Sequence, residues 1–210
     1  MENKKQLDLW DDESRCLRLQ KLWGYDEVFT DPLRTEFLRI TNQMIASYER
    51  PPTILEVGCG SGSNLWAWKG KARLIGLDYS EIMLNLAKEK FKGYAIMLDQ
   101  DSCWELPYKD TSFDIVVQMD VCLHLGGSWE SIQEMIRVAR KYVVFTGPSF
   151  EAWKNKMSER IEGKLSWGIS LPLLEKQLEK KKKRKKIKNY FFLTRPKHGN
   201  IKHKILVIEK

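Results

Sequence analysis

The chain has 210 residues, 42% hydrophobic and 30% charged, which is enough to bury a sizeable core in one domain. No uncharged stretch is long enough to span a bilayer and Met1 to Asp12 is charged, so we expect a soluble cytoplasmic protein without a membrane contact. The net charge is +8, but eight basic residues lie between Lys180 and Lys188. The remaining sequence is neutral, which argues against a broad basic surface for nucleic acid.

The four cysteines lie far apart, without a CxxC pair and without a histidine at the spacing of zinc ligands. We therefore expect reduced thiols and no metal site. The cysteines are Cys16, Cys59, Cys103 and Cys122.

The first 50 residues are predicted to be helical. Apolar residues recur every three or four positions before Pro51, and Asp31-Pro32 marks a helix start. Aromatic residues earlier in this segment suggest a lid over a substrate or, more simply, anchors on the core. They are Trp10, Trp23, Tyr25 and Phe29. We expect residues 1–50 to form a helical lid or cap, and residues 51–210 the functional part of a single domain.

Strands and helices alternate from residue 53 to residue 146. Strands are predicted at 53–57, 73–77, 94–98, 113–118 and 142–146, and helices at 64–69, 80–91 and 128–139. Strands separated by helices indicate a mainly parallel α/β sheet. Beyond Pro148 we expect helices at 150–161 and 173–186, then strands at 189–194 and 204–208. The turn residues between these strands predict a terminal antiparallel hairpin.

Closely spaced glycines follow the first strand. Gly58, Gly60 and Gly62 lie between a strand and a helix, where glycine lets the backbone approach a nucleotide or nucleoside. Asp78 ends the second strand, where a carboxylate can accept hydrogen bonds from both ribose hydroxyls. A tight turn with a helix-capping aspartate is the simpler alternative. The GxGxG spacing, and Glu56 directly before the turn, argue against a nicotinamide or flavin dinucleotide.

Several ordered blocks between residues 50 and 147 resemble the class I S-adenosylmethionine-dependent methyltransferases. The blocks are residues 54–62, residues 76–80 with Met83, Leu106-Pro107-Tyr108, and residues 112–117. The resemblance implies a Rossmann-like, seven-stranded, mainly parallel sheet with helices on both faces and an antiparallel last strand. It also implies S-adenosyl-L-methionine as the cofactor.

The resemblance assigns roles to residues of this chain. It implies that Asp78 holds the ribose, that Tyr79 and Met83 line the adenine site, and that Asp101 meets the adenine amine, with Asp99 or Ser102 as alternatives. The backbone of Gln118 and Met119 would contact the methionine end. The loop residues in this set are Glu56, Gly58, Cys59, Gly60 and Gly62. For Cys59, a small filler residue is a simpler role than a nucleophile.

An activated methyl group needs in-line approach and exclusion of water more than covalent help. His124 is the candidate general base if the acceptor arrives protonated, and Asp120 could orient an amine or take its proton. A structural histidine and a helix-capping aspartate are the alternatives. Trp153, Trp167 and Pro172 form a second candidate wall for the acceptor.

We expect a small-molecule methyl acceptor. An RNA or phosphorylated acceptor bound by the run from Lys180 to Lys188 is one alternative, although such a run is also typical of a solvated helix face. A cofactor-binding subunit without catalysis is another. The oligomeric state and the acceptor atom stay open.

Overall fold

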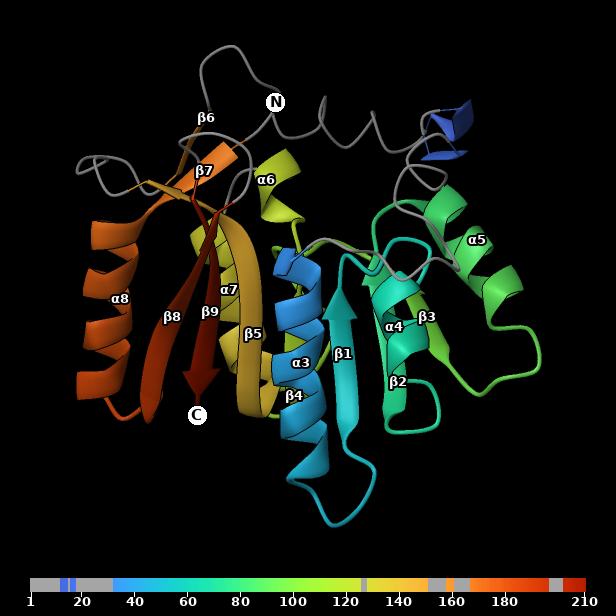
Figure 1. Ribbon diagram of the computed structural model, residues 1–210, viewed down its shortest axis with the longest axis horizontal. Coiled ribbons are helices and arrows are strands. Elements are labelled where there is room, and N and C mark those ends of the chain that lie inside the picture. Colours follow the sequence, from blue (N-terminus) through green and yellow to red (C-terminus); the bar gives the residue numbers. More distant parts are fainter. Residues whose placement is uncertain are drawn as a thin grey trace.

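The computed structural model describes residues 12–14, 16–17, 32–125, 128–150, 158–160, 167–196 and 202–210. These residues form a nine-stranded sheet with helices packed against it (Figure 1). The parallel part has the order β3-β2-β1-β4-β5. Its strands are β1 (Thr53–Val57), β2 (Arg73–Asp78), β3 (Met97–Gln100), β4 (Phe113–Gln118) and β5 (Ala139–Phe150).

The C-terminal hairpin completes the sheet beside β5. Strand β9 (Lys202–Glu209) runs antiparallel to β5, and β8 (Asn189–Pro196) runs antiparallel to β9. The predicted seven-stranded sheet with an antiparallel terminal hairpin is therefore confirmed. Two short strands that the sequence did not predict extend it: β7 (Trp167–Ser170) pairs with the end of β5, and β6 (Ser158–Arg160) pairs with β7.

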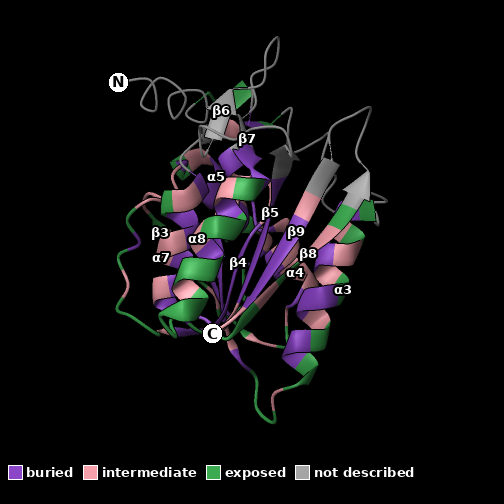
Figure 2. Cartoon of the chain, turned by 90° about the vertical axis from the view of Figure 1, so that its left-hand side faces the viewer, coloured by how far each residue is buried: buried purple, intermediate pink, exposed green. Residues whose placement is uncertain are grey.

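Two hydrophobic cores lie on opposite faces of the sheet. Neighbouring strand residues alternate between them, as strand geometry requires: Ile54 belongs to one core and Leu55 to the other. The first core is covered by α3 (Pro32–Ala46), α4 (Ser63–Ala67) and α5 (Glu81–Lys90), and the second by α7 (Ser128–Val138) and α8 (Leu171–Lys183). The strands between them carry mostly buried residues (Figure 2). None of the helices described is long and apolar enough to cross a membrane, and the location of the protein in the cell stays a prediction.

The predicted helix before Pro51 is confirmed as α3. Its buried residues Leu33, Phe37 and Ile40 pack in the same core as Ile54 of β1. The division into a cap of residues 1–50 and a domain of residues 51–210 stays a prediction. Most of the aromatic residues considered as walls lie outside the described residues: Trp10, Trp23, Tyr25, Phe29, Trp153 and the side chain of Trp167.

The predicted helix at 150–161 is wrong where the structure describes it. Strand β5 continues to Phe150 because it pairs with β9 and β7, and residues 158–160 form β6. The third strand begins at Met97 rather than residue 94, since Gly93 has a positive φ of 82° and the Tyr94 amide closes a turn onto the Phe91 carbonyl. Asp99 therefore lies within β3 and Asp101 follows it. Helix α8 spans 171–183 rather than 173–186.

Candidate active site

The loop between β1 and α4 needs its glycines. Gly58, Gly60 and Gly62 have φ values of 72°, 53° and 81°, the left-handed region that L side chains rarely adopt. A Cβ added to Gly58 would lie 2.2 Å from a methyl carbon of Val121. The amides of Gly58 and Cys59 both donate to the Leu77 carbonyl, at 2.6 and 3.0 Å. The loop is therefore fixed to the end of β2, with its backbone turned tightly enough for close approach of a ligand.

Asp78 joins the glycine loop to the next helix. One carboxylate oxygen accepts a hydrogen bond from the Gly60 amide at 2.7 Å, and the other accepts from the Ser80 amide at 2.9 Å. Ser80 is the predicted N-cap of α5, and its hydroxyl accepts from the Met83 amide. Burial raises the pKa of Asp78, although the amides of Ser80 and Gly60 oppose the shift. The glycine loop and Asp78, which the sequence analysis assigned to one site, thus lie together. Asp78 also accepts from the Ser80 amide, as expected for the simpler alternative of a helix-capping aspartate.

Glu56 is the most deeply buried acid of the site, with 1% of its surface exposed. Its Oε1 accepts a hydrogen bond from Asn64 Nδ2 at 2.7 Å, while its Oε2 has no hydrogen-bond partner among the described residues. Burial raises the pKa of Glu56 to about 8, Asn64 and Arg34 lower it, and Asp78 raises it further. A buried carboxyl group with an unpaired oxygen is unfavourable unless a ligand completes it.

Sequence reasoning missed two residues near this acid: Asn64, which contacts it, and Arg34, which contacts Asn64. Arg34 of α3 donates from Nε to Asn64 Oδ1 at 2.8 Å and from a terminal nitrogen to the Ser63 carbonyl at 3.0 Å. Asn64 in turn donates to Glu56 and lies 3.8 Å from the Met119 sulfur. Asn64 directly follows the loop, a position that could have drawn attention to it. Arg34 lies 30 residues earlier, where no spacing rule connects it to the loop.

Cys59 lies inside the loop as a packed thiol. It is buried, and a Cβ added to Gly76 would come within 2.7 Å of its sulfur. Burial, with further contributions from Asp78 and Glu56, raises the pKa of the Cys59 thiol. A neutral, enclosed thiol supports the role of a small filler residue.

The three candidates in and just after β3 all make local contacts. The Asp101 amide donates to the Asp78 carbonyl at 3.2 Å, which places Asp101 beside the ribose candidate. One Asp101 carboxylate oxygen accepts from the Ser102 amide, and Asp99 accepts from the Tyr108 hydroxyl at 2.7 Å. The Ser102 hydroxyl accepts from the Trp104 amide. Asp101 is thus adjacent to Asp78, and the assignment of the adenine amine to it stays a prediction.

The end of β4 contributes the residues expected near the methyl group. Gln118 is fully buried and its side chain contacts Ser131 and Cys122, so that side chain is engaged within the core, and the predicted backbone contact with the cofactor stays a prediction. Asp120 has a left-handed φ of 56°, and both its amide and its carboxylate bond the Thr146 hydroxyl, at 2.9 and 3.0 Å. His124 is half-buried on α6 (Cys122–Leu125). Because β4 lies next to β1 and runs parallel to it, Asp120 lies at the same end of the sheet as the glycine loop, beyond the carboxyl ends of the strands.

Part of the chain matches a known family of proteins. Residues 54–143 match a family described as a methyltransferase domain. The chain is 34% identical over 92 residues to phosphatidylethanolamine N-methyltransferase of Cereibacter sphaeroides, covering 42% of this chain and 45% of that protein. It is 29% identical over 118 residues to phosphoethanolamine N-methyltransferase 1 of Arabidopsis thaliana, covering 53% of this chain and 23% of that protein. The chain thus spans less than half the length of these two relatives.

A solved structure extends the comparison over the whole fold. Magnesium protoporphyrin IX methyltransferase from Synechocystis, crystallised with bound S-adenosylmethionine, aligns with a TM-score of 0.67 over 100% of this chain and 98% of that one. The sequences are 14% identical, so this likeness concerns the fold alone. The matching family model, the sheet order and the glycine loop thus agree that residues 54–143 form a methyltransferase domain, with a fold shared by that S-adenosylmethionine-bound structure.

Proposed function

We propose that this protein transfers the methyl group of S-adenosylmethionine directly to a small-molecule acceptor. The observation that carries the proposal is the buried Glu56 carboxyl, with its unpaired oxygen, beside a glycine loop that Asp78 closes. Burial raises the pKa of both acids by disfavouring their ionised forms, and a positively charged ligand would stabilise those forms, so a cation fits this place. S-adenosylmethionine fits because it carries an ammonium and a sulfonium charge, and it supplies an already activated methyl carbon.

The residues of the chain hold and orient this cofactor. Asp78 accepts hydrogen bonds from the ribose hydroxyls, and Tyr79 and Met83 line the adenine site. Met83 supports this role because its methyl carbon would lie 3.2 Å from a Cβ added to Gly60, directly against the loop. Asp101 meets the adenine amine, and Glu56 with the backbone of Gln118 and Met119 faces the methionine end.

The acceptor binds beside Asp120. Its left-handed backbone and its two contacts with Thr146 fix the carboxylate at the end of β4. A fixed carboxylate can orient a protonated amine and take its proton, and His124 is the second candidate for that base. Catalysis then rests mainly on the in-line approach of the acceptor and on exclusion of water.

An amine is the favoured class of acceptor. Both relatives named above are N-methyltransferases. The ends of β1 to β4 carry the acids Glu56, Asp78, Asp99, Asp101 and Asp120. Such a run of acids, even with Glu56 largely protonated near pH 7, attracts a cationic amine and repels a polyanion. This supports a small amine over RNA.

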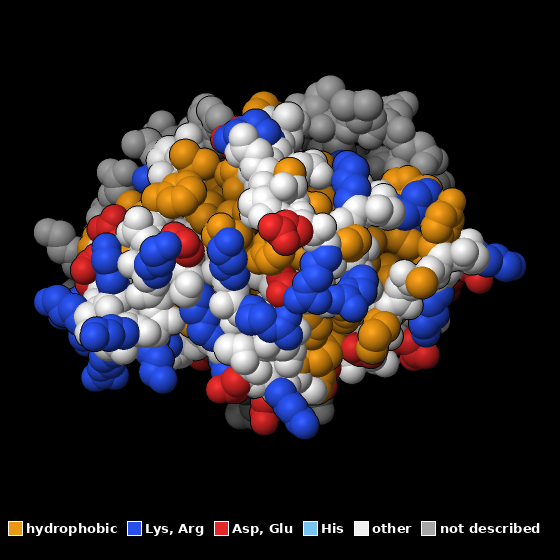
Figure 3. Space-filling model, turned by 90° about the horizontal axis from the view of Figure 1, so that it is seen from below, with side chains coloured by type: hydrophobic (Ala, Val, Ile, Leu, Met, Phe, Trp, Pro, Cys, Tyr) orange, Lys and Arg blue, Asp and Glu red, His pale blue; other side chains and the backbone are white. Residues whose placement is uncertain are grey.

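The position of the lysine run also argues against RNA as the acceptor. The Lys188 amide donates to the Glu209 carbonyl, and Glu209 pairs with Tyr142 near the start of β5. Asp120 contacts Thr146, which lies about 13 Å further along that strand. Figure 3 views this opposite end from below, where Lys and Arg side chains outnumber acidic ones. The run lies away from the proposed methyl-transfer site.

Methyl-labelled S-adenosylmethionine and separate panels of small amines, small alcohols and thiols, and RNA test the proposal. We expect label in an amine, and loss of it in Asp120→Ala when that residue orients the acceptor. Label in RNA alone, reduced by neutralising Lys180 to Lys188, would instead favour the RNA alternative. Heat on titration with the cofactor but no labelled product from any panel would favour the non-catalytic subunit.

A further inference from the structure

Helix α3 reaches the proposed cofactor site through one side chain. Arg34 contacts both the first residue of α4, through the Ser63 carbonyl, and the side chain of the second, Asn64. α4 starts at the last glycine of the loop, and Gly62 as its N-cap offers no side chain to hold that start. The helix has five residues, too few to fix its own position. Arg34 therefore supplies a contact that the loop cannot make for itself.

The contact continues to the buried acid. Asn64 accepts from Arg34 with its oxygen and donates to Glu56 with its nitrogen, so the amide is oriented from both sides. Without Arg34 the Asn64 side chain loses the partner that determines which way its amide faces. The Asn64 donor to Glu56 would then be less firmly oriented, and the Leu65 amide would remain as the other donor near the carboxyl group.

We propose that Arg34 is a positioning residue of the cofactor site, which acts through Asn64 to hold Glu56 toward the ligand. This inference rests on the proposed function. It makes α3 a part of the binding machinery rather than only a helix that covers the sheet.

Release of a proton from Glu56 on ligand binding distinguishes this role of Arg34 from a purely structural one. Among the described residues, the titratable groups that face Glu56 are Arg34 from α3, Asp78 from the end of β2 and the neutral Cys59 thiol of the loop. Arg34 lowers the pKa of Glu56, which burial has raised to about 8. Near pH 7 the carboxyl group is thus largely protonated before binding, and a cationic ligand favours its ionised form. Binding should therefore release a proton from Glu56.

Calorimetric titration with S-adenosylhomocysteine, in two buffers of different ionisation enthalpy between pH 6.5 and 9, measures affinity and proton release together. We expect wild type to release close to one proton near pH 7. Arg34→Gln should bind about tenfold more weakly, because a charge-assisted contact is lost. Its proton release should persist to higher pH than in wild type, since the group that lowers the pKa of Glu56 is gone. Arg34→Lys should restore part of the affinity.

Arg39→Gln is the matched control. Arg39 lies on the same helix and pairs with Glu36 in an exposed i, i+3 ion pair, so its removal should change neither affinity nor proton release. A double-mutant cycle with Asn64→Ala follows the path of the effect: the loss in the double variant should be no larger than in Asn64→Ala alone. The cycle uses variants whose unfolding curves match wild type, and Arg34→Lys replaces Arg34→Gln if the latter unfolds.

Additive losses in the cycle, or an Arg34→Gln variant with the affinity and proton release of wild type, would overturn this role of Arg34. A wild-type protein that binds neither S-adenosylhomocysteine nor S-adenosylmethionine would instead overturn the proposed function on which it rests. Wild-type binding separates the two failures.

Discussion

At the two ends of the parallel sheet, the pKa values of carboxyl groups are shifted in opposite directions. At the carboxyl ends of β1 and β2, Glu56 is buried and Asp78 half-buried beside the glycine loop, and burial raises the pKa of both. At the amino end of β4, hydrogen bonds from Thr53 and Arg140 outweigh burial and lower the pKa of Asp114. Asp114 at the second end stabilises the fold in its ionised form, whereas Glu56 at the first end keeps a carboxyl oxygen without a hydrogen-bond partner among the described residues.

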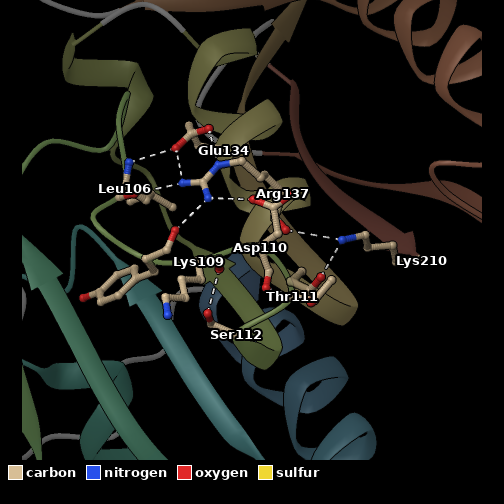
Figure 4. Close-up of polar contacts among 10 residues, drawn as sticks. Leu106, Lys109, Asp110, Thr111, Ser112, Glu134, Arg137 and Lys210 are labelled. Carbon is tan, nitrogen blue, oxygen red and sulfur yellow. Dashed lines mark hydrogen bonds and ion pairs between the residues drawn. The ribbon is translucent and has the colours of Figure 1, made fainter.

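The amino end also shows how complete such pairing can be. Arg137 bonds both carboxylate oxygens of Glu134, the Asp110 carboxylate and the carbonyls of Leu106 and Tyr108 (Figure 4). The Arg137 contact lowers the pKa of Glu134. One side chain thus fastens α7 to the segment before β4. Among the acids compared, Glu56 at the candidate site is the one with a carboxyl oxygen that lacks a hydrogen-bond partner.

Replacing Asp78 by alanine should give the largest effect. The carboxylate is expected to accept two hydrogen bonds from the ribose, and it already holds the Gly60 amide. Loss of charge-assisted bonds of this kind costs about 3 kcal/mol, or at least about 100-fold in affinity. Calorimetric titration with S-adenosylhomocysteine measures it, with Glu89→Ala, an exposed residue of α5, as the control. Unchanged affinity in Asp78→Ala would remove the ribose assignment.

Glu56→Gln should make the protein more stable at alkaline pH while lowering its affinity for the cofactor. The folded pKa of about 8 lies above the ordinary value of 4.5. A raised carboxyl pKa gives stability that is complete below pH 4.5 and is lost as the pH rises through 8. At pH 8 the glutamine variant should exceed wild type by about 1–3 kcal/mol in free energy of unfolding, and the two should agree near pH 4.5.

Denaturant unfolding of the ligand-free protein at the two pH values measures this difference. A glutamine variant that is less stable than wild type at pH 8 would show that the Glu56 carboxylate is satisfied without a ligand. The contrast between the two ends would then be lost.

Local signals explain why much of this site was predictable. The glycines, Glu56 and Asp78 lie at the ends of neighbouring strands, and β4 was predicted with the bounds that the structure shows. Arg34 was not predictable because its contact depends on how α3 packs across the sheet. The strand at residues 139–150 was underestimated because its second half is determined by pairing with β9, more than fifty residues later in the chain.

Arg137→Met should lower the free energy of unfolding by about 2 kcal/mol and leave cofactor affinity unchanged. The loss includes two loop carbonyls that the arginine satisfies, in addition to the ion pair with Glu134. Arg39→Met is a matched control, because Arg39 and Glu36 form an i, i+3 pair with the same 2.7 Å separation but without bonds to a distant loop. We expect less than about 0.5 kcal/mol there. Equal losses of unfolding free energy in Arg137→Met and Arg39→Met would show that the two carbonyl contacts do not contribute to stability.

Asp114→Asn should show a pH dependence opposite to that of Glu56→Gln. A depressed pKa gives stability that is present above the ordinary value of 3.8 and is lost as the pH falls through the folded value. The variant should therefore be less stable than wild type at pH 7, by about 1 kcal/mol, and the gap should narrow toward pH 2. Denaturant unfolding at both pH values measures the gap. A gap that widens on acidification would contradict the assigned sign.

Neutralising part of the lysine run should have the smallest effect. Burial lowers the pKa of Lys181, and the nearby charges of Lys186 and Arg184 lower it further, so these cations repel one another. Replacing Lys182, Lys183, Lys185 and Lys186 by glutamine should therefore raise the free energy of unfolding by less than about 0.5 kcal/mol at low salt, and by nothing measurable at high salt, where exposed charges are screened. Affinity for S-adenosylhomocysteine should stay within about twofold of wild type, because the run lies at the end of the sheet opposite Asp78. A larger loss of affinity would mean that charge at the amino end acts on the carboxyl end, and the two ends would no longer be independent.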